Sequence, residues 1–254
     1  MYQNYIFDLY GTLVDIRTNE QKHYLWEKMA LYMRLQGADY TAKELKKAYH
    51  TQISAQRTRN LTAAQHNPTF NHDSGIQSTE LKPEEIEVSF ETLIPALYQA
   101  KGVEITEKQA ADWAVLFRAL SLEHLSLYEG AAALLKHLRG KGRKIYLLSN
   151  AQRLFTEPEM RALGIYDYFD KIYYSSDIGF VKPSPHFYQR LLQEQRMNPN
   201  DSVMVGNDDK ADAWGAHDNG LDSIYIYTKQ SPKPEHPLPD NCRVITDLSE
   251  ILKI

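Results

Sequence analysis

The stretch IFDLYGTLVD, residues 6–15, lies near the start of the chain and decides which fold the sequence predicts. Two apolar residues lead to a single acid, Asp8, and Gly11 and Thr12 follow it closely. This pattern is typical of a buried strand that presents a carboxylate at its end. Tyr10 raises a question, because it stands two positions after Asp8, where a second carboxylate would be useful.

The composition is that of a folded protein without an unusual charge. The chain has 254 residues, 43% of them hydrophobic, enough for one large domain or for a domain that carries an insertion. Its formal net charge of -4 offers no basic field to a nucleic-acid backbone. No apolar run approaches the roughly 20 residues that a membrane helix needs, and no charged leader opens the chain. We therefore expect a cytosolic protein with neither nucleic acid nor membrane as a partner.

The single cysteine, Cys242, excludes an internal disulfide and a thiolate metal cluster, since both need more sulfur. It lies in a polar stretch without a histidine neighbour, so we interpret it as a structural residue.

Two patterns divide the chain. Residues 17–126 read as helix and loop, with Leu25, Met29, Leu31 and Met33 near helical spacing and a polar stretch, residues 66–75, expected to be a loop. From Tyr128 onward, expected strands (144–150, 170–177, 202–208 and 222–228) alternate with expected helices (130–142, 185–195 and the end of one at 213–220). The sequence predicts an α/β protein: a doubly wound, Rossmann-like parallel-sheet core (1–16 and 127–254) with an inserted helical cap (17–126).

Polar side chains follow four of the apolar runs, and the carboxyl ends of parallel strands meet at one edge of a sheet. Alone, each group is equally compatible with a cap, a turn or a solvated loop; together, in this order, they favour a site. The residues are Asp8, Thr12, Ser149, Asn150, Lys182, Asn207, Asp208, Asp209 and Asp212.

The chemistry that this set supports is nucleophilic displacement by a carboxylate. Asp8 would form a covalent ester that water then hydrolyses. Lys182 would hold Asp8 beside an anionic substrate, and Ser149 and Asn150 would donate to substrate oxygens. The acids after Val205 would hold Mg²⁺, which prefers oxygen ligands.

The motifs FDLYGTLVD, LLSN, FVKPSP and VGNDDKADAWGA resemble, in order and spacing, the four motifs of the haloacid dehalogenase superfamily of hydrolases. The insertion after the first motif resembles that superfamily's C1-type cap. The resemblance implies that Asp8 is the nucleophile, that Thr12 orients its loop, that Ser149 donates to a substrate oxygen and that Lys182 balances charge.

The resemblance also implies a Mg²⁺ site for those members that use the metal. Its ligands would be the Asp8 carboxylate, the backbone carbonyl of Tyr10 and an acid of the fourth motif. Asn207 occupies the place of the usual aspartate and still offers a carbonyl oxygen, and Asp208 and Asp212 are the neighbouring carboxylates.

Most phosphatases of the superfamily have, at the position of Tyr10, an aspartate that protonates the leaving group and later activates water. A phenol with a pKa near 10 is a poor general base at neutral pH. Either the leaving group needs little protonation, as in an acyl phosphate, or another residue supplies the proton. A tyrosine at this position is similar to the dehalogenase branch of the superfamily, in which the leaving halide needs no proton and the reaction needs no metal. A further alternative is that Tyr10 only packs between the core and the cap.

We therefore expect a Mg²⁺-dependent phosphatase of a small phosphorylated metabolite that acts through an aspartyl-phosphate at Asp8. Two alternatives remain, a metal-independent 2-haloacid dehalogenase that uses Asp8 and a catalytically weak member that binds a metabolite or a partner. The dehalogenase branch receives the halide on a cap arginine, and no cap arginine considered aligns with it: Arg17, Arg34, Arg57 and Arg59. Cap aromatic residues would either line the substrate pocket or form the core of the cap: Tyr24, Trp26, Tyr32, Phe70 and Trp113.

Overall fold

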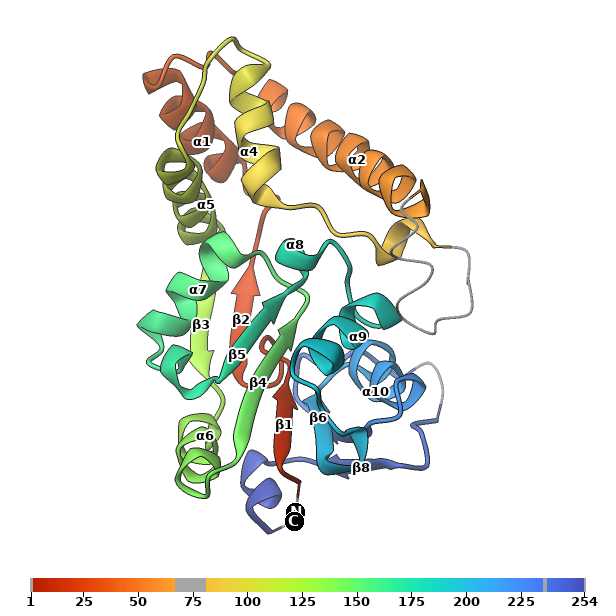
Figure 1. Ribbon diagram of the computed structural model, residues 1–254. Coiled ribbons are helices and arrows are strands. Elements are labelled where there is room, and N and C mark those ends of the chain that lie inside the picture. Colours follow the sequence, from red (N-terminus) through yellow and green to blue (C-terminus); the bar gives the residue numbers. More distant parts are fainter. Residues whose placement is uncertain (1, 67–80, 235–236, 254) are drawn as a thin grey trace.

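A six-stranded parallel sheet forms the centre of the protein in the computed structural model, which describes residues 2–66, 81–234 and 237–253 (Figure 1). The strand order is β5-β4-β1-β6-β7-β8, so β1 lies between β4 and β6 and the order reverses there. Such a reversal leaves a crevice at the carboxyl ends of the strands. The strands are β1 (Asn4–Phe7), β4 (Lys144–Ser149), β5 (Lys171–Tyr174), β6 (Ser202–Gly206), β7 (Asp222–Ile226) and β8 (Cys242–Ile245).

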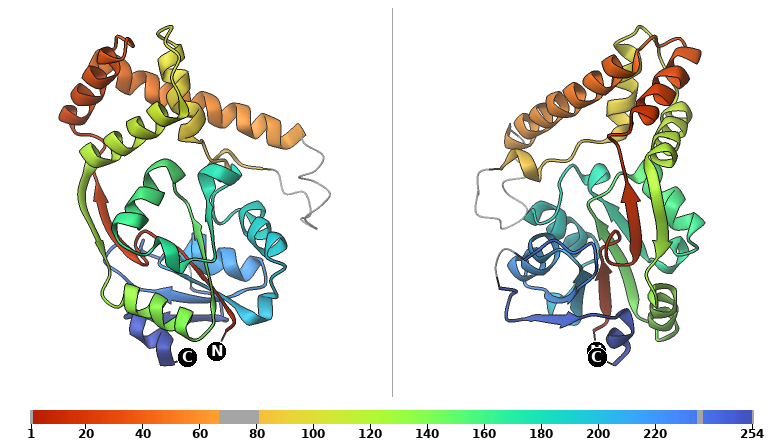
Figure 2. Two further views of the ribbon diagram at one scale, coloured as in Figure 1. Left: turned by 60° about the vertical axis from the view of Figure 1, so that its left-hand side comes forward. Right: turned by 180° about the vertical axis from the view of Figure 1, so that it is seen from behind.

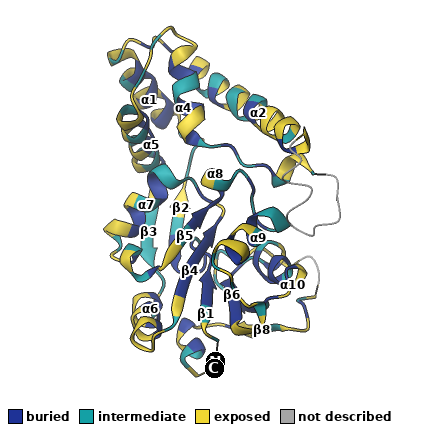
Figure 3. Cartoon of the chain, in the orientation of Figure 1, coloured by how far each residue is buried: buried dark blue, intermediate teal, exposed yellow. Residues whose placement is uncertain are grey.

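Helices cover both faces of this sheet, because alternate residues of each strand point to opposite faces. Tyr5 and Phe7 pack with α6 (Ala131–Gly140) and with Met160 of α7 (Arg153–Ala162). Ile6 packs with α9 (Pro185–Glu194) and α10 (Gly215–Asp218) on the other face. Figure 3 shows the central strands as the most continuously buried part of the molecule. The predicted doubly wound core is confirmed.

A helical block stands over the carboxyl edge of the sheet (Figures 1 and 2). It consists of α1 (His23–Leu35), α2 (Ala42–His66), α4 (Phe90–Gln99) and α5 (Glu107–Ser121). These helices share an apolar core of their own, to which Trp26 and Trp113 belong. Tyr32 packs partly against it, Tyr24 is exposed, and Phe70 lies outside the described residues.

One residue of the predicted helical stripe is on the wrong side. Leu25, Met29 and Met33 are buried as expected, but Leu31 is 44% exposed. The buried stripe of α1 recurs every three to four residues, and Leu31 lies two positions from Met29 and Met33, on the opposite side of the helix.

Two strands connect the helical block to the core. The sequence pattern predicted only helix and loop from about residue 17 to about residue 126. β2 (Val14–Thr18) pairs antiparallel with β3 (Leu122–Leu127), and the pair crosses both expected domain boundaries. LEHLSL in β3 does not alternate strictly, since Glu123 and His124 are both polar, and it forms a strand with β2, more than 100 residues away, as its partner. The division into residues 1–16 with 127–254 and residues 17–126 stays a prediction.

Shorter elements complete the described chain. Helix α7 and strand β8 were not expected from the sequence, and the end of the expected strand 170–177 is the helical turn α8 (Ser175–Ile178). A π-helical turn, Asp209–Trp214, precedes α10. Short 3₁₀ turns occupy Pro83–Glu85, Tyr166–Tyr168, Pro199–Asp201 and Leu248–Lys253. Within the three described ranges, no helix has the length and apolar character needed to span a bilayer.

Candidate active site

Asp8, Lys182 and Asp212 meet at the carboxyl edge of the sheet, as the sequence predicted. Asp8 follows β1, and its backbone N–H donates to the carbonyl of Val205 at 2.9 Å. Lys182 Nζ lies 2.8 Å from Asp8 Oδ1 and 2.7 Å from Asp212 Oδ1. All three side chains are buried, so this ammonium group balances two carboxylates where water screens little.

Burial affects the pKa values of both Lys182 and Asp212. Burial opposes the charged ammonium, but Asp212 and Asp8 outweigh it and raise the pKa of Lys182 above its ordinary value. Burial also raises the pKa of the Asp212 carboxyl to about 7, although Lys182 opposes the shift. The backbone N–H of Asp208 donates to Asp212 Oδ2 at 3.0 Å, so both Asp212 oxygens have a donor.

Gly206, the last residue of β6, leaves the space that Asp212 occupies. A methyl group on Gly206 would lie 2.1 Å from Asp212 Oδ2. We expect Gly206→Ala to lower the turnover number at least about 100-fold, because the Asp212 carboxylate must move away from Lys182. Turnover measured beside that of Gly140→Ala, where an added methyl group meets nothing within 4 Å, checks this. Equal rates for the two variants would show that Asp212 does not need this position.

Thr12 binds two of the predicted site residues at once. Its hydroxyl lies 3.1 Å from Asp8 Oδ2 and 3.2 Å from Asn207 Oδ1. A hydroxyl has one proton to donate, so the two acceptors share it. Thr12 thereby holds residues 8–12, the loop of the predicted nucleophile Asp8 (the nucleophile loop), against the loop that follows β6.

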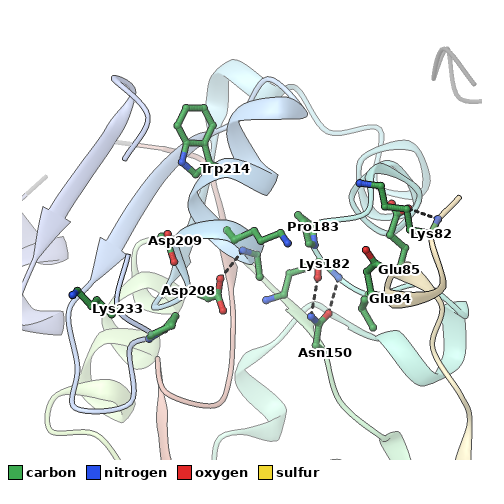
Figure 4. Close-up of a pocket in the computed structure, with 14 residues that line it drawn as sticks. Lys82, Glu84, Glu85, Asn150, Lys182, Pro183, Asp208, Asp209, Trp214 and Lys233 are labelled. Atoms are coloured by element: carbon green, nitrogen blue, oxygen red, sulfur yellow. Dashed lines mark hydrogen bonds between the residues drawn. The ribbon is translucent and has the colours of Figure 1, made fainter. Parts of the chain in front are cut away.

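Ser149 is the last residue of β4 and Asn150 follows it, and the two side chains differ in what they contact. Asn150 clamps the backbone of Lys182: its Nδ2 donates to the Lys182 carbonyl at 3.0 Å, and its Oδ1 accepts from the Lys182 N–H at 2.7 Å (Figure 4). The geometry therefore supports a role in placing Lys182, and donation from Asn150 to a substrate stays a prediction. Ser149 is buried, and its hydroxyl has no hydrogen-bond partner within the described ranges, which leaves it available to a substrate oxygen.

The side chain of Tyr10 binds helix α7. Its hydroxyl donates to Glu159 Oε2 and lies 2.9 Å from Thr156 Oγ1. Burial, with the neighbouring Glu159, holds the pKa of the Tyr10 phenol well above its ordinary value. Glu159 in turn forms an ion pair with Arg118 of α5 at 3.1 Å. Thr156, Glu159 and Arg118 were not predicted from the sequence, because no motif marks them and each of the two helices has several charged residues.

The oxygen atoms that the sequence predicted to hold a cation belong to the loops that follow β1 and β6. They are the Asp8 carboxylate, the Tyr10 carbonyl, the Asn207 side-chain oxygen and the Asp208 carboxylate, whose Oδ1 accepts from the Ala211 N–H at 2.6 Å. Asp212 is already bound to Lys182. No group of three or more His, Cys, Asp or Glu side chains in the part of the chain that the structure describes is arranged to hold a metal.

A pocket of about 880 Å³ opens beside Lys182 (Figure 4). One side comes from the segment that precedes α4, and the other from the residues around the π-helical turn and the loop after β7. None of the four described cap aromatic residues lines it, and Trp214 is the aromatic residue that does. The lining includes Lys82, Glu84, Glu85, Asn150, Lys182, Asp208, Asp209, Lys210, Trp214 and Lys233.

The model of the haloacid dehalogenase-like hydrolase family matches residues 2–220, so the chain belongs to that family of hydrolases. It is 28% identical to the glyceraldehyde 3-phosphate phosphatase of Methanothermobacter thermautotrophicus over 120 residues, 46% of this chain and 53% of that protein. It is also 28% identical to the N-acylneuraminate-9-phosphatase of Rattus norvegicus over 146 residues, 57% of this chain and 58% of that protein. The chain thus spans little more than half the length of these two curated relatives.

Solved structures with the same fold include phosphatases and dehalogenases. The HAD-hydrolase YfnB from Bacillus subtilis, solved with magnesium, has a TM-score of 0.54 at 20% identity, with 99% of this chain and 97% of that chain covered. The L-2-haloacid dehalogenase from Xanthobacter autotrophicus has a TM-score of 0.54 at 16% identity, with 100% and 98% covered. At these identities the likeness shows the fold alone.

Proposed function

We propose that the protein is a Mg²⁺-dependent phosphatase of a small phosphorylated metabolite and that it acts through an aspartyl-phosphate at Asp8. The observation that carries the proposal is the ion pairing of Lys182 with both Asp8 and Asp212. It places a fixed cation beside the Asp8 carboxylate, where a phosphoryl group would arrive. The curated relatives reported above are phosphatases by name. The expected cytosolic location, and the expectation that neither nucleic acid nor membrane is a partner, stay predictions.

In the proposed reaction, an Asp8 oxygen attacks phosphorus, and the bond between phosphorus and the leaving oxygen breaks with its electron pair. Water then attacks the aspartyl-phosphate, which releases phosphate and restores the carboxylate. Lys182 offsets the repulsion between Asp8 and the anionic substrate, and the Ser149 hydroxyl donates to a phosphoryl oxygen. The Tyr10 phenol donates to Glu159 instead, which favours substrates whose leaving group needs little protonation, such as acyl phosphates.

The residues around Asp8 fit a weakly held Mg²⁺. The oxygen atoms of Asp8, Tyr10 (its carbonyl), Asn207 and Asp208 would hold the cation, and Asp212 would stay with Lys182. When bound, Mg²⁺ would neutralise charge on the phosphoryl oxygens. This set of ligands has one negative charge fewer than a set with an aspartate at position 207. The number of charged ligands tunes the affinity of such sites for the cation, so we expect a lower affinity for Mg²⁺.

An Asn207→Asp variant is expected to bind Mg²⁺ about tenfold more tightly, because it adds a carboxylate to the set. Calorimetric titration of Mg²⁺ into the protein, and the Mg²⁺ concentration that gives half-maximal activity, measure the change. Asn200→Asp, which adds the same charge in the exposed turn at the amino end of β6, is the matched control. Equal Mg²⁺ affinity of the two variants would remove position 207 from the set of ligands.

A second candidate function is a metal-independent 2-haloacid dehalogenase, which Tyr10 favours by its position after Asp8. Halide binding in that branch needs a cap arginine with a free charge. Arg118 is a cap arginine close to Tyr10, with its guanidinium 5.9 Å from the Tyr10 ring. Its charge is balanced by Glu159, so it is a poor halide receptor in this arrangement.

The experiment that tests the proposal is hydrolysis of phosphomonoesters, acyl phosphates and 2-chloropropionate, each with Mg²⁺ and with EDTA. Phosphate release that needs both Mg²⁺ and Asp8 supports the phosphatase. Chloride release that survives EDTA and is lost in Asp8→Asn moves the protein to the dehalogenase function. If no substrate is turned over and a phosphorylated metabolite still binds to wild type and Asp8→Asn alike, the protein is the catalytically weak binding member.

A further inference from the structure

Tyr10, Glu159 and Arg118 form a largely buried chain of contacts across three parts of the molecule. Tyr10 belongs to the nucleophile loop, Glu159 to α7 and Arg118 to cap helix α5. The Tyr10 hydroxyl donates to one Glu159 oxygen, and the Arg118 guanidinium pairs with the other at 3.1 Å. The side chains of Arg118 and Glu159 are only 14% and 8% exposed, so little water competes for these contacts.

Helix α7 joins the cap to the core at this point. Phe155, in its first turns, belongs to the apolar core of the cap, and Met160, further along, packs against the sheet. The Arg118 guanidinium lies 3.8 Å from the centre of the Phe155 ring, in a cation–π contact. Figure 1 shows α7 directly below α5, between the cap and the sheet. A shift of the cap would therefore act on α7 and on Glu159.

The nucleophile loop is short and internally bonded, so a displacement of Tyr10 is passed to Asp8. The N–H groups of Leu13 and Val14 both donate to the carbonyl of Leu9, at 2.9 Å each. Thr12, two residues from Tyr10, holds the Asp8 carboxylate through its hydroxyl. These bonds tie the loop together, and the Tyr10 side chain contacts α7.

We propose that Tyr10 is a positioning residue: through Glu159 it fixes the nucleophile loop relative to the cap arginine Arg118, and it is not the acid that protonates the leaving group. The inference rests on the proposed hydrolysis at Asp8 and deepens it. The Tyr10 hydroxyl has a single proton, and the Glu159 carboxylate accepts it in a hydrogen bond. The chain therefore makes the placement of Asp8 depend on the cap being seated.

The direct test is Tyr10→Phe, which removes only the hydroxyl. We expect the turnover number to fall about 10- to 100-fold, as misplacement of a reacting group does, while KM changes little. The fall should be the same for substrates with good and with poor leaving groups. The matched control is Tyr98→Phe, since the buried Tyr98 also donates through its hydroxyl, to Gln36 at 2.6 Å, but within the cap. This control should keep the wild-type rate.

Two further measurements separate positioning from general loss of stability. Arg118→Met should lower the turnover number like Tyr10→Phe, and the double variant should be little worse than either, because both break one chain. Hydrogen exchange of residues 8–16 in the substrate-free protein should be faster in Tyr10→Phe and Arg118→Met than in Tyr98→Phe.

Specific outcomes overturn the inference. A fall in turnover that steepens with the pKa of the leaving group would make Tyr10 an acid catalyst. If Tyr10→Phe and Arg118→Met keep the wild-type turnover, or if their residues 8–16 exchange as slowly as in Tyr98→Phe, the contacts from Tyr10 through Glu159 to Arg118 have no role in positioning. The exchange experiment needs no substrate, so it decides the role of Tyr10 even if the proposed phosphatase activity is absent.

Discussion

Replacing Lys182 with methionine is expected to abolish hydrolysis and to lower the free energy of unfolding by about 3–5 kcal/mol. Methionine fills a similar volume, so the effect comes from the lost charge. Asp8 and Asp212 would then remain as two buried carboxylates without the ammonium group that lies within 2.8 Å of both. Urea unfolding and turnover on the substrate found in the hydrolysis panel measure the two effects. A stable variant at pH 8 would contradict the argument.

The loss of stability should depend on pH, with a sign that follows from the groups involved. In wild type, the raised pKa of Lys182 makes its stabilising contribution complete below the pKa of an unfolded lysine, including pH 5 to 8. In Lys182→Met, the buried Asp212 carboxyl, whose pKa burial already raises in wild type, loses the ammonium that opposes this shift and takes up a proton more readily when folded than when unfolded. Stability then falls as pH rises, so the deficit should be smaller at pH 5 than at pH 8.

An exposed lysine provides the control for Lys182. Lys144 pairs with Asp170 at 2.9 Å, but its side chain is 60% exposed, and solvent screens pairs of that kind so that they contribute little to stability. Lys144→Met should therefore change the free energy of unfolding little at either pH. The contrast between the two variants isolates the contribution of burial.

The site could be predicted from sequence because its residues follow strands. The register of β1 with β4 and β6 brings Asp8, Ser149 and Asn207 to one edge, which follows from parallel pairing once the strands are recognised. The sequence signals for turns and helices are also local, because they depend on residues close together in the chain. The family of hydrolases was predicted from the resemblance of four motifs, and the doubly wound fold from alternating strand and helix patterns; both are confirmed.

What the sequence could not show depends on contacts between distant residues. Glu159 reads as one of many helical glutamates until Tyr10 and Arg118 are placed beside it. Lys82, Glu84 and Glu85 line the pocket only because residues 85–87 bind to the core. There the Glu87 N–H donates to the Gly179 carbonyl at 2.9 Å, and the Val181 N–H donates to the Glu85 carbonyl at 3.0 Å. No local pattern encodes such pairings.

The same segment, continuing to residue 90, also contacts the core through Gln152. The Gln152 side chain accepts from the Phe90 N–H at 2.9 Å and donates to the Val88 carbonyl at 2.7 Å. Gln152 lies two residues after Asn150, which ends the second motif and holds the backbone of Lys182. Residues directly after β4 thus hold both the lysine of the site and the cap segment that forms one side of the pocket.

Asp8→Asn is expected to lower the turnover number at least about 1,000-fold without loss of stability, because an amide is no nucleophile here. The asparagine oxygen can still accept from Lys182, and the buried charges become one ammonium and one carboxylate instead of one and two. The free energy of unfolding should therefore be equal to or above that of wild type. Mass spectrometry of acid-quenched wild type should find a phosphoryl group on the peptide that contains Asp8, absent in the variant. Residual turnover of Asp8→Asn above a few per cent of wild type would assign the nucleophile to another residue.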